Sequence, residues 1–277
     1  MGGKFYACLD RDIKEILLKQ IRNLWTHTST AIEGNSLTLG DTEFILEEGL
    51  TVAGKPIRDH QDVIGHAKAI EVVYQLVEKD SIAEEDIFAL HRVMLIDPVL
   101  DVYRPVGAWK AEDNFTNYID PQGKQKWRQY PATSKTPALM AEWLQKLNQA
   151  LQQPLSRDAA LGAYADLHLD FVTIHPFFDG NGRMARLLCN LPVLKAGFPP
   201  IVVPEADRQR YKKTISDYQS NISDLERIQS LQCFPCNAGR KAFIELCRGY
   251  WSETMELLDN AHAIQSRRRG GPGSETE

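Results

Sequence analysis

The stretch from Ile174 to Arg186, which reads IHPFFDGNGRMAR, constrains the fold of this chain more than any other segment. Apolar residues before it recur at the spacing of one helix face, at Ala163, Leu167, Phe171 and Ile174. Pro176 disfavours α geometry in the preceding residue, so this helix must end near Ile174 or His175. After the Gly-Asn-Gly turn the helical period resumes, at Met184, Leu187, Leu188 and Leu191. The stretch therefore predicts two helices joined by a short loop.

This loop and the start of the second helix carry groups suited to phosphate chemistry. A glycine-rich backbone that leads into a helix presents unpaired N–H groups and the positive end of the helix dipole. Arg183 and Arg186 are three residues apart, so they share a helix face and reinforce an anion site. His175 can carry a proton near neutral pH, and Asp179 is a hard oxygen ligand suited to Mg²⁺. We interpret the stretch as a phosphate-and-metal cradle with a general base at its rim.

Composition excludes several other classes of protein. The 277 residues are enough for one large domain or one domain with an appendage, and a content of 43% hydrophobic and 25% charged residues is ordinary for a globular protein. A net charge of −5 leaves no general basic surface for nucleic acid. No apolar run reaches the ~18 residues that a membrane span needs, and the N-terminus lacks a signal-peptide core. We therefore expect a cytoplasmic protein that binds neither nucleic acid nor membranes.

The remaining sequence is mostly helical in pattern. Apolar periods and capping residues predict further helices at 10–28, 42–48, 62–78, 81–95, 136–147, 205–218 and 240–263. Pro192 predicts a kink in the helix after the glycine turn, or its early end. Residues 266–277, rich in arginine and then in Gly, Pro, Ser and Glu, are predicted to form a disordered tail. The fold class expected from these patterns is all-α.

Residues 97–131 break the helical pattern with prolines, glycines and aromatic residues. Within them, residues 117–124 read as strand, turn and strand, which predicts a β-hairpin. A connection this long in a compact domain is usually a lid or a binding element. Cys233 and Cys236 form a lone CxxC pair, and its role is left open.

Glu33 stands at the end of the first predicted helix. Gly34 and Asn35 tolerate the left-handed conformation that ends a helix. A negative charge at a helix C-terminus has the unfavourable sign. Glu33 is therefore expected to have a cationic partner elsewhere in the chain.

The stretch from His175 to Arg186 resembles the signature of Fic-domain proteins, HPFx[D/E]GN[G/K]Rxx[R], at every signature position. Leu90-His91, Tyr103-Arg104, Trp109, Tyr130-Pro131 and residues 196–200 are also similar to Fic domains. The resemblance implies a Fic domain over about residues 61–255, built as a helical bundle with one β-hairpin flap near the active site. It also implies an N-terminal helical segment, 1–60, and a C-terminal helix end with a tail, 256–277. The usual activity of the family is AMPylation, the transfer of AMP from ATP to a protein hydroxyl with release of pyrophosphate.

The resemblance assigns a role to each signature residue. His175 would be the base that takes the proton from a Ser, Thr or Tyr hydroxyl, and Asp179 would hold Mg²⁺. The ATP phosphates would be bound by Gly180, Asn181, Gly182, Arg183 and Arg186. Asn117, Tyr118 and Ile119 in the flap would dock the backbone of the target protein. Tyr211 and Gln219 are aligned with positions that contact the adenosine.

A second motif resembles the inhibitory helix of autoinhibited Fic proteins, [S/T]xxxE[G/N]. It spans Ser29, Glu33 and Gly34 in this chain, within a helix expected over about residues 13–34. The implied partner of Glu33 is Arg186, and pairing them would remove one phosphate clamp. The resemblance therefore predicts a protein adenylyltransferase that is weakly active at rest.

Three other functions remain open. The same site could remove AMP from a modified protein, could transfer phosphate or phosphocholine, or could sense ATP without turnover. The sequence does not name the target protein or its modified residue. Modification of the chain itself is expected, and the family resemblance makes a homodimer plausible.

Overall fold

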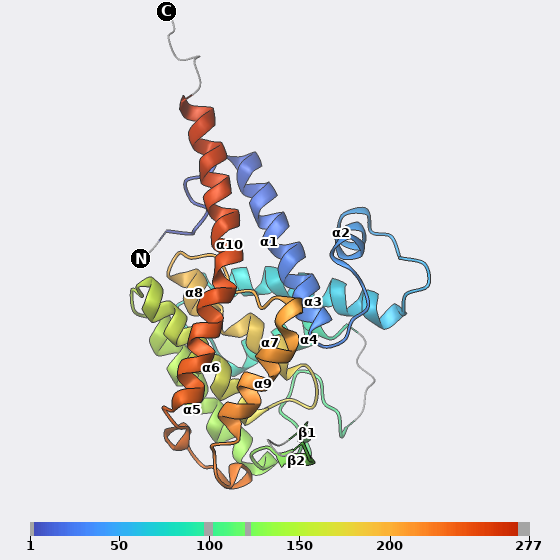
Figure 1. The fold of residues 1–277 in the computed structure, drawn as a ribbon, viewed down its shortest axis with the longest axis vertical. Coiled ribbons are helices and arrows are strands. Elements are labelled where there is room, and N and C mark those ends of the chain that lie inside the picture. Colours follow the sequence, from blue (N-terminus) through green and yellow to red (C-terminus); the bar gives the residue numbers. More distant parts are fainter. Residues whose placement is uncertain (1–2, 97–101, 120–122, 271–277) are drawn as a thin grey trace, which may run out of the picture.

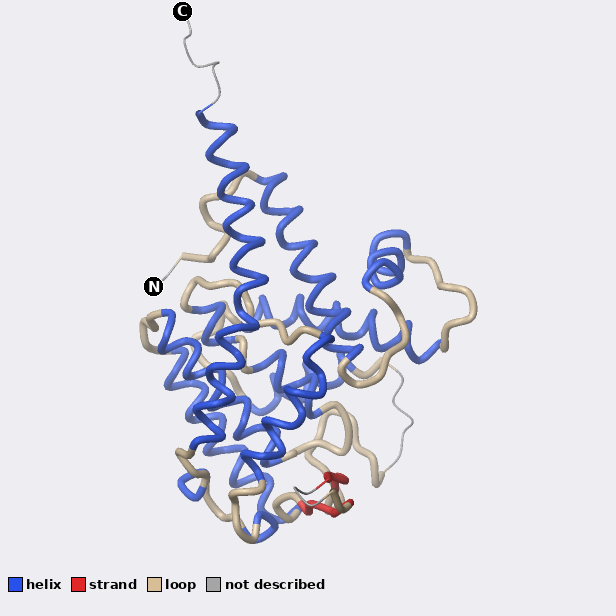
Figure 2. The backbone as a smooth tube through the Cα atoms, in the orientation of Figure 1, coloured by secondary structure: helices blue, strands red, loops and turns tan. Residues whose placement is uncertain are grey.

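The computed structural model describes residues 3–96, 102–119 and 123–270, and these form a helical fold with one small hairpin (Figures 1 and 2). The helices are α1 (Arg11–Ala31), α2 (Leu39–Glu48), α3 (Ile57–Leu76), α4 (Glu84–Met94), α5 (Thr136–Leu151), α6 (Arg157–Ile174), α7 (Asn181–Leu188), α8 (Leu191–Lys195), α9 (Arg208–Gln219) and α10 (Ala238–Gly270). The strands are β1 (Phe115–Ile119) and β2 (Gln125–Gln129). None of the helices in these ranges is long and apolar enough to cross a membrane.

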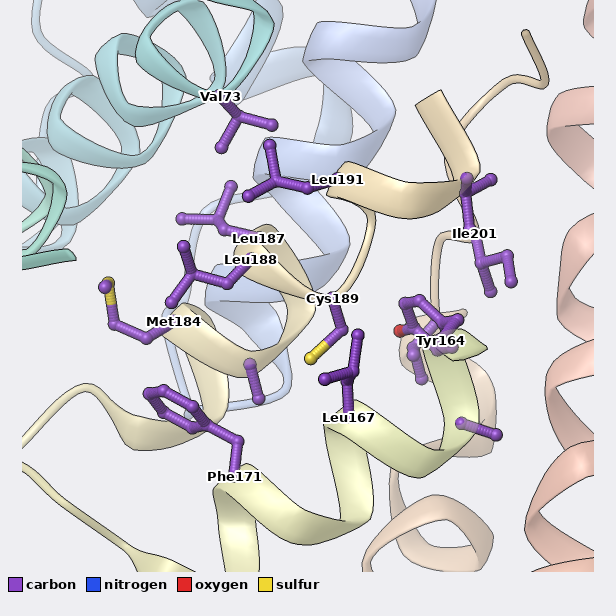
Figure 3. Packing of buried hydrophobic residues seen from close by; sticks show 14 of the residues in the cluster. Val73, Tyr164, Leu167, Phe171, Met184, Leu187, Leu188, Cys189, Leu191 and Ile201 are labelled. Atoms are coloured by element: carbon purple, nitrogen blue, oxygen red, sulfur yellow. The ribbon is translucent and has the colours of Figure 1, made fainter. Parts of the chain in front are cut away.

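Helix α6 lies at the centre of the bundle and packs against α5, α7, α8 and α10. Its residues are buried nearly all round from Ala160 onward, as expected for a helix enclosed by others. Figure 3 shows Phe171 of α6 beside Met184 of α7, and Leu167 of α6 beside Cys189, which follows α7. The loop between α6 and α7 is therefore held at both ends by well-packed helices.

Helices α1 and α10 run side by side and extend beyond the body of the bundle (Figure 1). The prediction that disorder begins at residue 266 is wrong for 266–270, because α10 continues to Gly270. Gln265 accepts a hydrogen bond from the Asp10 N–H at 2.7 Å, and Arg268 pairs with Asp12 at 2.7 Å. The start of α1 thus supplies partners for the end of α10. Residues 271–277 lie outside the described part of the chain.

Several helix starts differ from the prediction because other residues cap them. Helix α2 begins at Leu39, since the Thr38 hydroxyl accepts from the Asp41 N–H and the Asp41 carboxylate accepts from the Thr38 N–H. Helix α4 begins at Glu84, three residues after the predicted start. The interruption at Pro192 is confirmed: α7 ends at Leu188, and the proline lies in the first turn of α8, where its missing N–H costs little.

The predicted hairpin is confirmed, with β1 and β2 antiparallel. Asn117, Tyr118 and Ile119 lie on β1, opposite Trp127, Lys126 and Gln125 in that order. Phe115 and Trp127 share the face that is exposed to solvent. Arg128 on the other face reaches α9, where it donates to the Ser216 carbonyl at 3.0 Å. We call this hairpin the flap.

Candidate active site

Helix α6 ends where Pro176 predicted, at Ile174, and His175 adopts the left-handed conformation (φ 52°, ψ 60°). Its N–H still donates to the Phe171 carbonyl at 2.9 Å, which closes the last turn. A non-glycine residue in this region of backbone space is uncommon and is often found at functional sites. The turn directs residues 175–180, which we call the His175 loop, away from the helix axis.

The His175 imidazole is held by stacking and by one hydrogen bond. It lies parallel to the Tyr130 ring, with centroids 3.9 Å apart. Its Nδ1 is 3.3 Å from the Val172 carbonyl, which can only accept, so the proton resides on Nδ1 and Nε2 carries the lone pair. Burial, helped by the charge of Lys110, lowers the pKa of His175 to about 4. The ring is therefore neutral at physiological pH and able to accept a proton at Nε2.

A buried network fixes the shape of the His175 loop. Asn181 bridges it, with Oδ1 accepting from the Phe177 N–H at 2.9 Å and Nδ2 donating to the Phe177 carbonyl at 2.8 Å. Phe177 is fully buried and stacks on His91. His91 accepts from the Gly107 N–H at Nδ1 and donates from Nε2 to the Asp179 carbonyl. His91 and Phe177 are thus both buried in the core, and both shape the loop.

Loss of the Asn181 amide should be costly. We expect Asn181→Ala to lower the free energy of unfolding by about 2–4 kcal/mol, because it strands the buried N–H of Phe177 and removes one of the two donors to the Phe177 carbonyl, the other being Asn114. Urea denaturation measures this, with Asn221→Ala as the control, since Asn221 donates to the Asp217 carbonyl on the exposed surface. Equal losses in both variants would contradict the bridging role.

Helix α7 begins with a glycine for a steric reason. Gly180 is its N-cap, with φ 79°, and a Cβ at this position would lie 2.7 Å from Met94 Cε. The N–H groups of the first turn, those of Asn181, Gly182 and Arg183, have no partner within the helix. They lie beside the cavity, so an anion placed there would meet unpaired donors and the positive end of the helix dipole.

Asp179 is the acid best placed to hold a metal. Its side chain is half-exposed at the cavity, with Oδ1 accepting from the Gly180 N–H at 2.7 Å and Oδ2 3.5 Å from Arg183 Nη2. No group of three or more His, Cys, Asp or Glu side chains in the described ranges could enclose a metal ion. Mg²⁺ is commonly held by one or two carboxylates together with substrate phosphates. A single exposed carboxylate beside an anion site fits such an ion.

The two arginines of α7 have different partners. Arg183 is nearly buried and pairs with Asp62 of α3. Arg186 is fully buried and points toward α1, where Nε donates to the Ser29 hydroxyl at 2.9 Å and Nη2 to the Ser29 carbonyl at 2.8 Å. Nη2 of Arg186 also donates to Glu33 Oε1 at 2.8 Å. The predicted pairing of Glu33 with Arg186 is thus confirmed.

Glu33 has a second cation beside it. Lys212 Nζ lies 3.4 Å from Glu33 Oε2. Burial opposes ionisation of Glu33, but the charges of Arg186 and Lys212 outweigh it and hold the pKa at about 2. A Cβ on Gly182 would lie 2.6 Å from Glu33 Oε1, so a glycine at this position lets the carboxylate approach the start of α7. The carboxylate therefore occupies a position that suits a small anion.

A cavity of about 340 Å³ joins these groups. Three segments line it: residues 30–35 at the end of α1, residues 58–62 at the start of α3, and residues 175–183. His175, Asp179, Asn181 and Arg183 share its wall with Glu33. The cavity thus places a neutral imidazole, an exposed carboxylate and a helix start around one polar space.

Comparison with known proteins agrees with this geometry. Residues 81–193 match the model of the Fic/DOC family. The chain belongs to this family. Protein adenylyltransferase fic-1 of Caenorhabditis briggsae is 32% identical over 214 residues, which are 76% of this chain and 38% of the relative. Protein adenylyltransferase Fic of Nematostella vectensis is 33% identical over 222 residues, which are 78% of this chain and 46% of the relative. The chain thus spans less than half the length of these curated relatives.

Solved structures support the all-α Fic fold that was predicted. A Fic domain containing signaling protein from Bacteroides thetaiotaomicron superposes with a TM-score of 0.71 over 98% of this chain and 95% of its own, at 23% identity. Residues 134–508 of Fic-1 from Caenorhabditis elegans give a TM-score of 0.67 over 94% of this chain and 69% of their own, at 26% identity. The helical bundle with one hairpin is therefore the Fic architecture.

Two residues predicted to contact adenosine are engaged elsewhere in this Fic fold. The Tyr211 hydroxyl lies 2.7 Å from His168 Nε2 and 3.5 Å from Arg186 Nη1, deep in the bundle. Gln219 is buried, with Oε1 accepting from Arg128 Nη1 at 2.8 Å. Neither residue lines the cavity, so their contact with a nucleoside stays a prediction. Asn117 and Tyr118 of the flap also lie outside the cavity wall.

The sequence reasoning missed several residues of the Fic site. Asp62 binds Arg183, and Arg58 lines the cavity with its guanidinium 3.8 Å from Asp179. Lys212 faces Glu33 from α9. All three lie on helices at positions where the sequence pattern predicts an ordinary charged residue facing solvent. No local pattern therefore separates them from the other charged surface residues.

Proposed function

We propose that this Fic domain is an autoinhibited protein adenylyltransferase, which transfers AMP from ATP to a Ser, Thr or Tyr hydroxyl of a protein. One observation carries the proposal: a neutral His175 borders the start of α7, where an anion would bind, while Glu33 forms an ion pair with Arg186 of the same helix. The relatives that share this domain are named protein adenylyltransferases. The chain covers less than half of each, so the activity is an inference from the site.

In this reaction the hydroxyl oxygen of the target attacks the α-phosphorus of ATP. A new oxygen–phosphorus bond forms, the bond to the bridging oxygen breaks, and pyrophosphate leaves. His175 Nε2 takes the hydroxyl proton, which its fixed tautomer and low pKa permit. Mg²⁺ held by Asp179 would offset charge on the phosphates.

The groups that would bind the phosphates are backbone N–H groups and a guanidinium whose positions the fold already fixes. The first-turn N–H groups of α7, those of Asn181, Gly182 and Arg183, lie at the cavity. The Arg183 guanidinium, positioned by Asp62, can add its charge without reorganising. The Asn181 side chain is committed to Phe177, so its predicted contribution to phosphate binding passes to its backbone N–H.

Autoinhibition follows from the partners of Arg186. Its guanidinium is occupied by Ser29, Tyr211 and Glu33, and Lys212 is drawn to the same carboxylate. A polyphosphate that needs these cations must displace the Glu33 carboxylate or bind without them. Either outcome leaves ATP poorly placed for attack, because transfer depends on the in-line geometry of the attacking and leaving oxygens.

The flap would dock the target protein. Its β1 residues Asn117, Tyr118 and Ile119 offer backbone groups for strand addition, and β2 stands on the other side of β1. The flap joins the His175 loop through Tyr130, which stacks on the imidazole. IbpAFic2, which shares this fold at 16% identity, has been solved covalently tethered to Cdc42. A protein substrate, including the chain itself, is the partner we propose, and a homodimer remains a prediction.

The position of the label in ATP tests the reaction class. We expect Glu33→Gly protein to label itself and proteins in a cell lysate from ATP carrying ³²P at the α-phosphate, with no label from the γ-phosphate. Mass spectrometry should then find peptides heavier by one AMP. Label from the γ-position alone would indicate phosphoryl transfer, and ATP binding without either label would indicate a nucleotide sensor.

Removal of AMP by the same site is a second candidate. Glu33 lines the cavity and is held ionised, so it could orient a water molecule toward an AMP-modified side chain. Incubation of AMP-modified protein with the wild-type chain tests this. Release of free AMP by the wild type but not by Glu33→Gly would favour it.

A further inference from the structure

Lys110 lies buried between the flap and the His175 loop. Only 2% of the residue is exposed, yet among the residues that the structure describes its ammonium group contacts only neutral acceptors. Nζ donates to Asn114 Oδ1 at 2.8 Å and to the Pro131 carbonyl at 2.8 Å, and the Ile174 carbonyl lies 3.5 Å away. These acceptors belong to three separate segments, which meet at this one charge.

Two of the three segments lie where the flap joins the body of the protein, at Asn114 and Pro131, and we call them the flap roots. Asn114 immediately precedes β1, and Pro131 follows β2 by one residue, Tyr130. A lysine that binds both therefore fixes the spacing of the two strands where they leave the body of the protein. Tyr130 lies between this root and the imidazole of His175, on which it stacks.

The other contacts lead to the His175 loop. The Lys110 N–H donates to the Pro176 carbonyl at 2.8 Å. Asn114, which accepts from Lys110, donates through Nδ2 to the His175 carbonyl at 3.2 Å and the Phe177 carbonyl at 3.0 Å. Lys110 and Asn114 thus bind the backbone on both sides of His175.

The buried charge of Lys110 lowers the stability of the fold compared with a neutral side chain of similar size. Burial lowers the pKa of Lys110 to about 8, and the Asp113 carboxylate acts in the opposite direction from outside hydrogen-bonding distance of the ammonium group. A buried charge without an ionic partner costs more than a well-packed neutral side chain of similar size. A strong, multivalent donor at this position must therefore supply something that packing does not.

We propose that Lys110 is a positioning residue, which holds the flap roots and the His175 loop in one arrangement so that a docked hydroxyl meets Nε2 of His175. Lys110 does not line the cavity, so it contributes to geometry and not to ATP binding. The target and the base lie on different segments, and Lys110 with Asn114 is the polar junction between them.

The rate of self-AMPylation in the Glu33→Gly background tests the positioning role of Lys110. This kinetic test rests on the proposed AMP transfer. We expect Lys110→Met to lower the rate of self-AMPylation at saturating ATP by about 10–100-fold, the loss that a displacement of about 1 Å causes. The Kd for ATP should change less than twofold by calorimetry. Lys110→Arg, which keeps the charge and the donors, should recover most of the rate.

Lys195→Met is the matched control. Lys195 also donates to backbone carbonyls, those of Val77 at 2.7 Å and Lys79 at 3.2 Å, but lies away from the flap and the His175 loop. It should leave the rate unchanged. An equal loss in both lysine variants, or a loss in Lys110→Met that appears entirely in the Kd for ATP, would overturn the proposal.

Hydrogen exchange supplies a readout that needs no activity. Peptides covering residues 112–132 and 172–180 should both exchange at least tenfold faster in Lys110→Met than in Lys195→Met. If Lys110→Met does not fold, Asn114→Ala, which keeps the lysine but cuts its link to the loop, should show the same pattern. Unchanged exchange in both segments refutes the positioning role, whereas faster exchange without AMP transfer in any variant refutes only the proposed function.

Discussion

Glu33→Gly is expected to raise AMP transfer about a hundredfold over the wild type. The substitution removes a carboxylate that accepts from Arg186 at 2.8 Å and attracts Lys212 at 3.4 Å. A charge-assisted hydrogen bond to a fully buried guanidinium contributes about 2–3 kcal/mol, and each 1.4 kcal/mol is a factor of ten in an equilibrium. Arg186 stays aimed by Ser29, so the freed cation is ready to bind a phosphate.

Incorporation of label from α-³²P ATP into the protein measures this effect. Glu47→Gly is the control, because Glu47 also lies between two cations, Lys19 and Arg22, but belongs to α2, away from Arg186. Glu33→Gln separates charge from shape and should give an intermediate rate. Equal labelling by the wild type and Glu33→Gly would refute autoinhibition and leave the AMP-transfer reaction itself open.

The same ion pair predicts how acid acts on the wild type. The pKa of Glu33 is lowered to about 2, below its ordinary value, so the carboxylate stays charged and paired until the pH falls through about 2. Moderate acid between pH 8 and 5 should therefore not relieve the inhibition. A rise in wild-type labelling across this range, absent from Glu33→Gly, would show that another group controls the pair.

Much of the site was predictable because its signals are local. Pro176 predicted the end of α6 through a steric rule that holds in any context. The Gly-Asn-Gly turn predicted the start of α7. The unfavourable sign of Glu33 at a helix end indicated a missing cation. The sequence could require such a partner, but only the family resemblance pointed to Arg186, because the pairing spans 153 residues.

What escaped prediction depends on tertiary contacts. Lys110 lies in an irregular segment with no period, so nothing marked it as buried. Gln219 was expected to contact the nucleoside because α9 was aligned by sequence alone. In the structure its amide oxygen accepts a hydrogen bond from Arg128 of the flap. The end of α10 was misplaced because Asp10 and Asp12, which stabilise its last turns, lie at the opposite end of the chain.

His175→Ala in the Glu33→Gly background should lower AMP transfer by about 10³-fold, within the range that general bases contribute. Calorimetry should find ATP binding within twofold of the parent, because the N–H groups of α7 and Arg183 remain. His262→Ala, an exposed histidine on α10, is the control. In the parent, activity should be flat from pH 8 to about 5.5 and fall as the pH drops through about 4, because protonation of His175 removes the lone pair. A parent whose rate falls near pH 6.5, or an alanine variant that keeps its rate, would show that the hydroxyl proton leaves by another route.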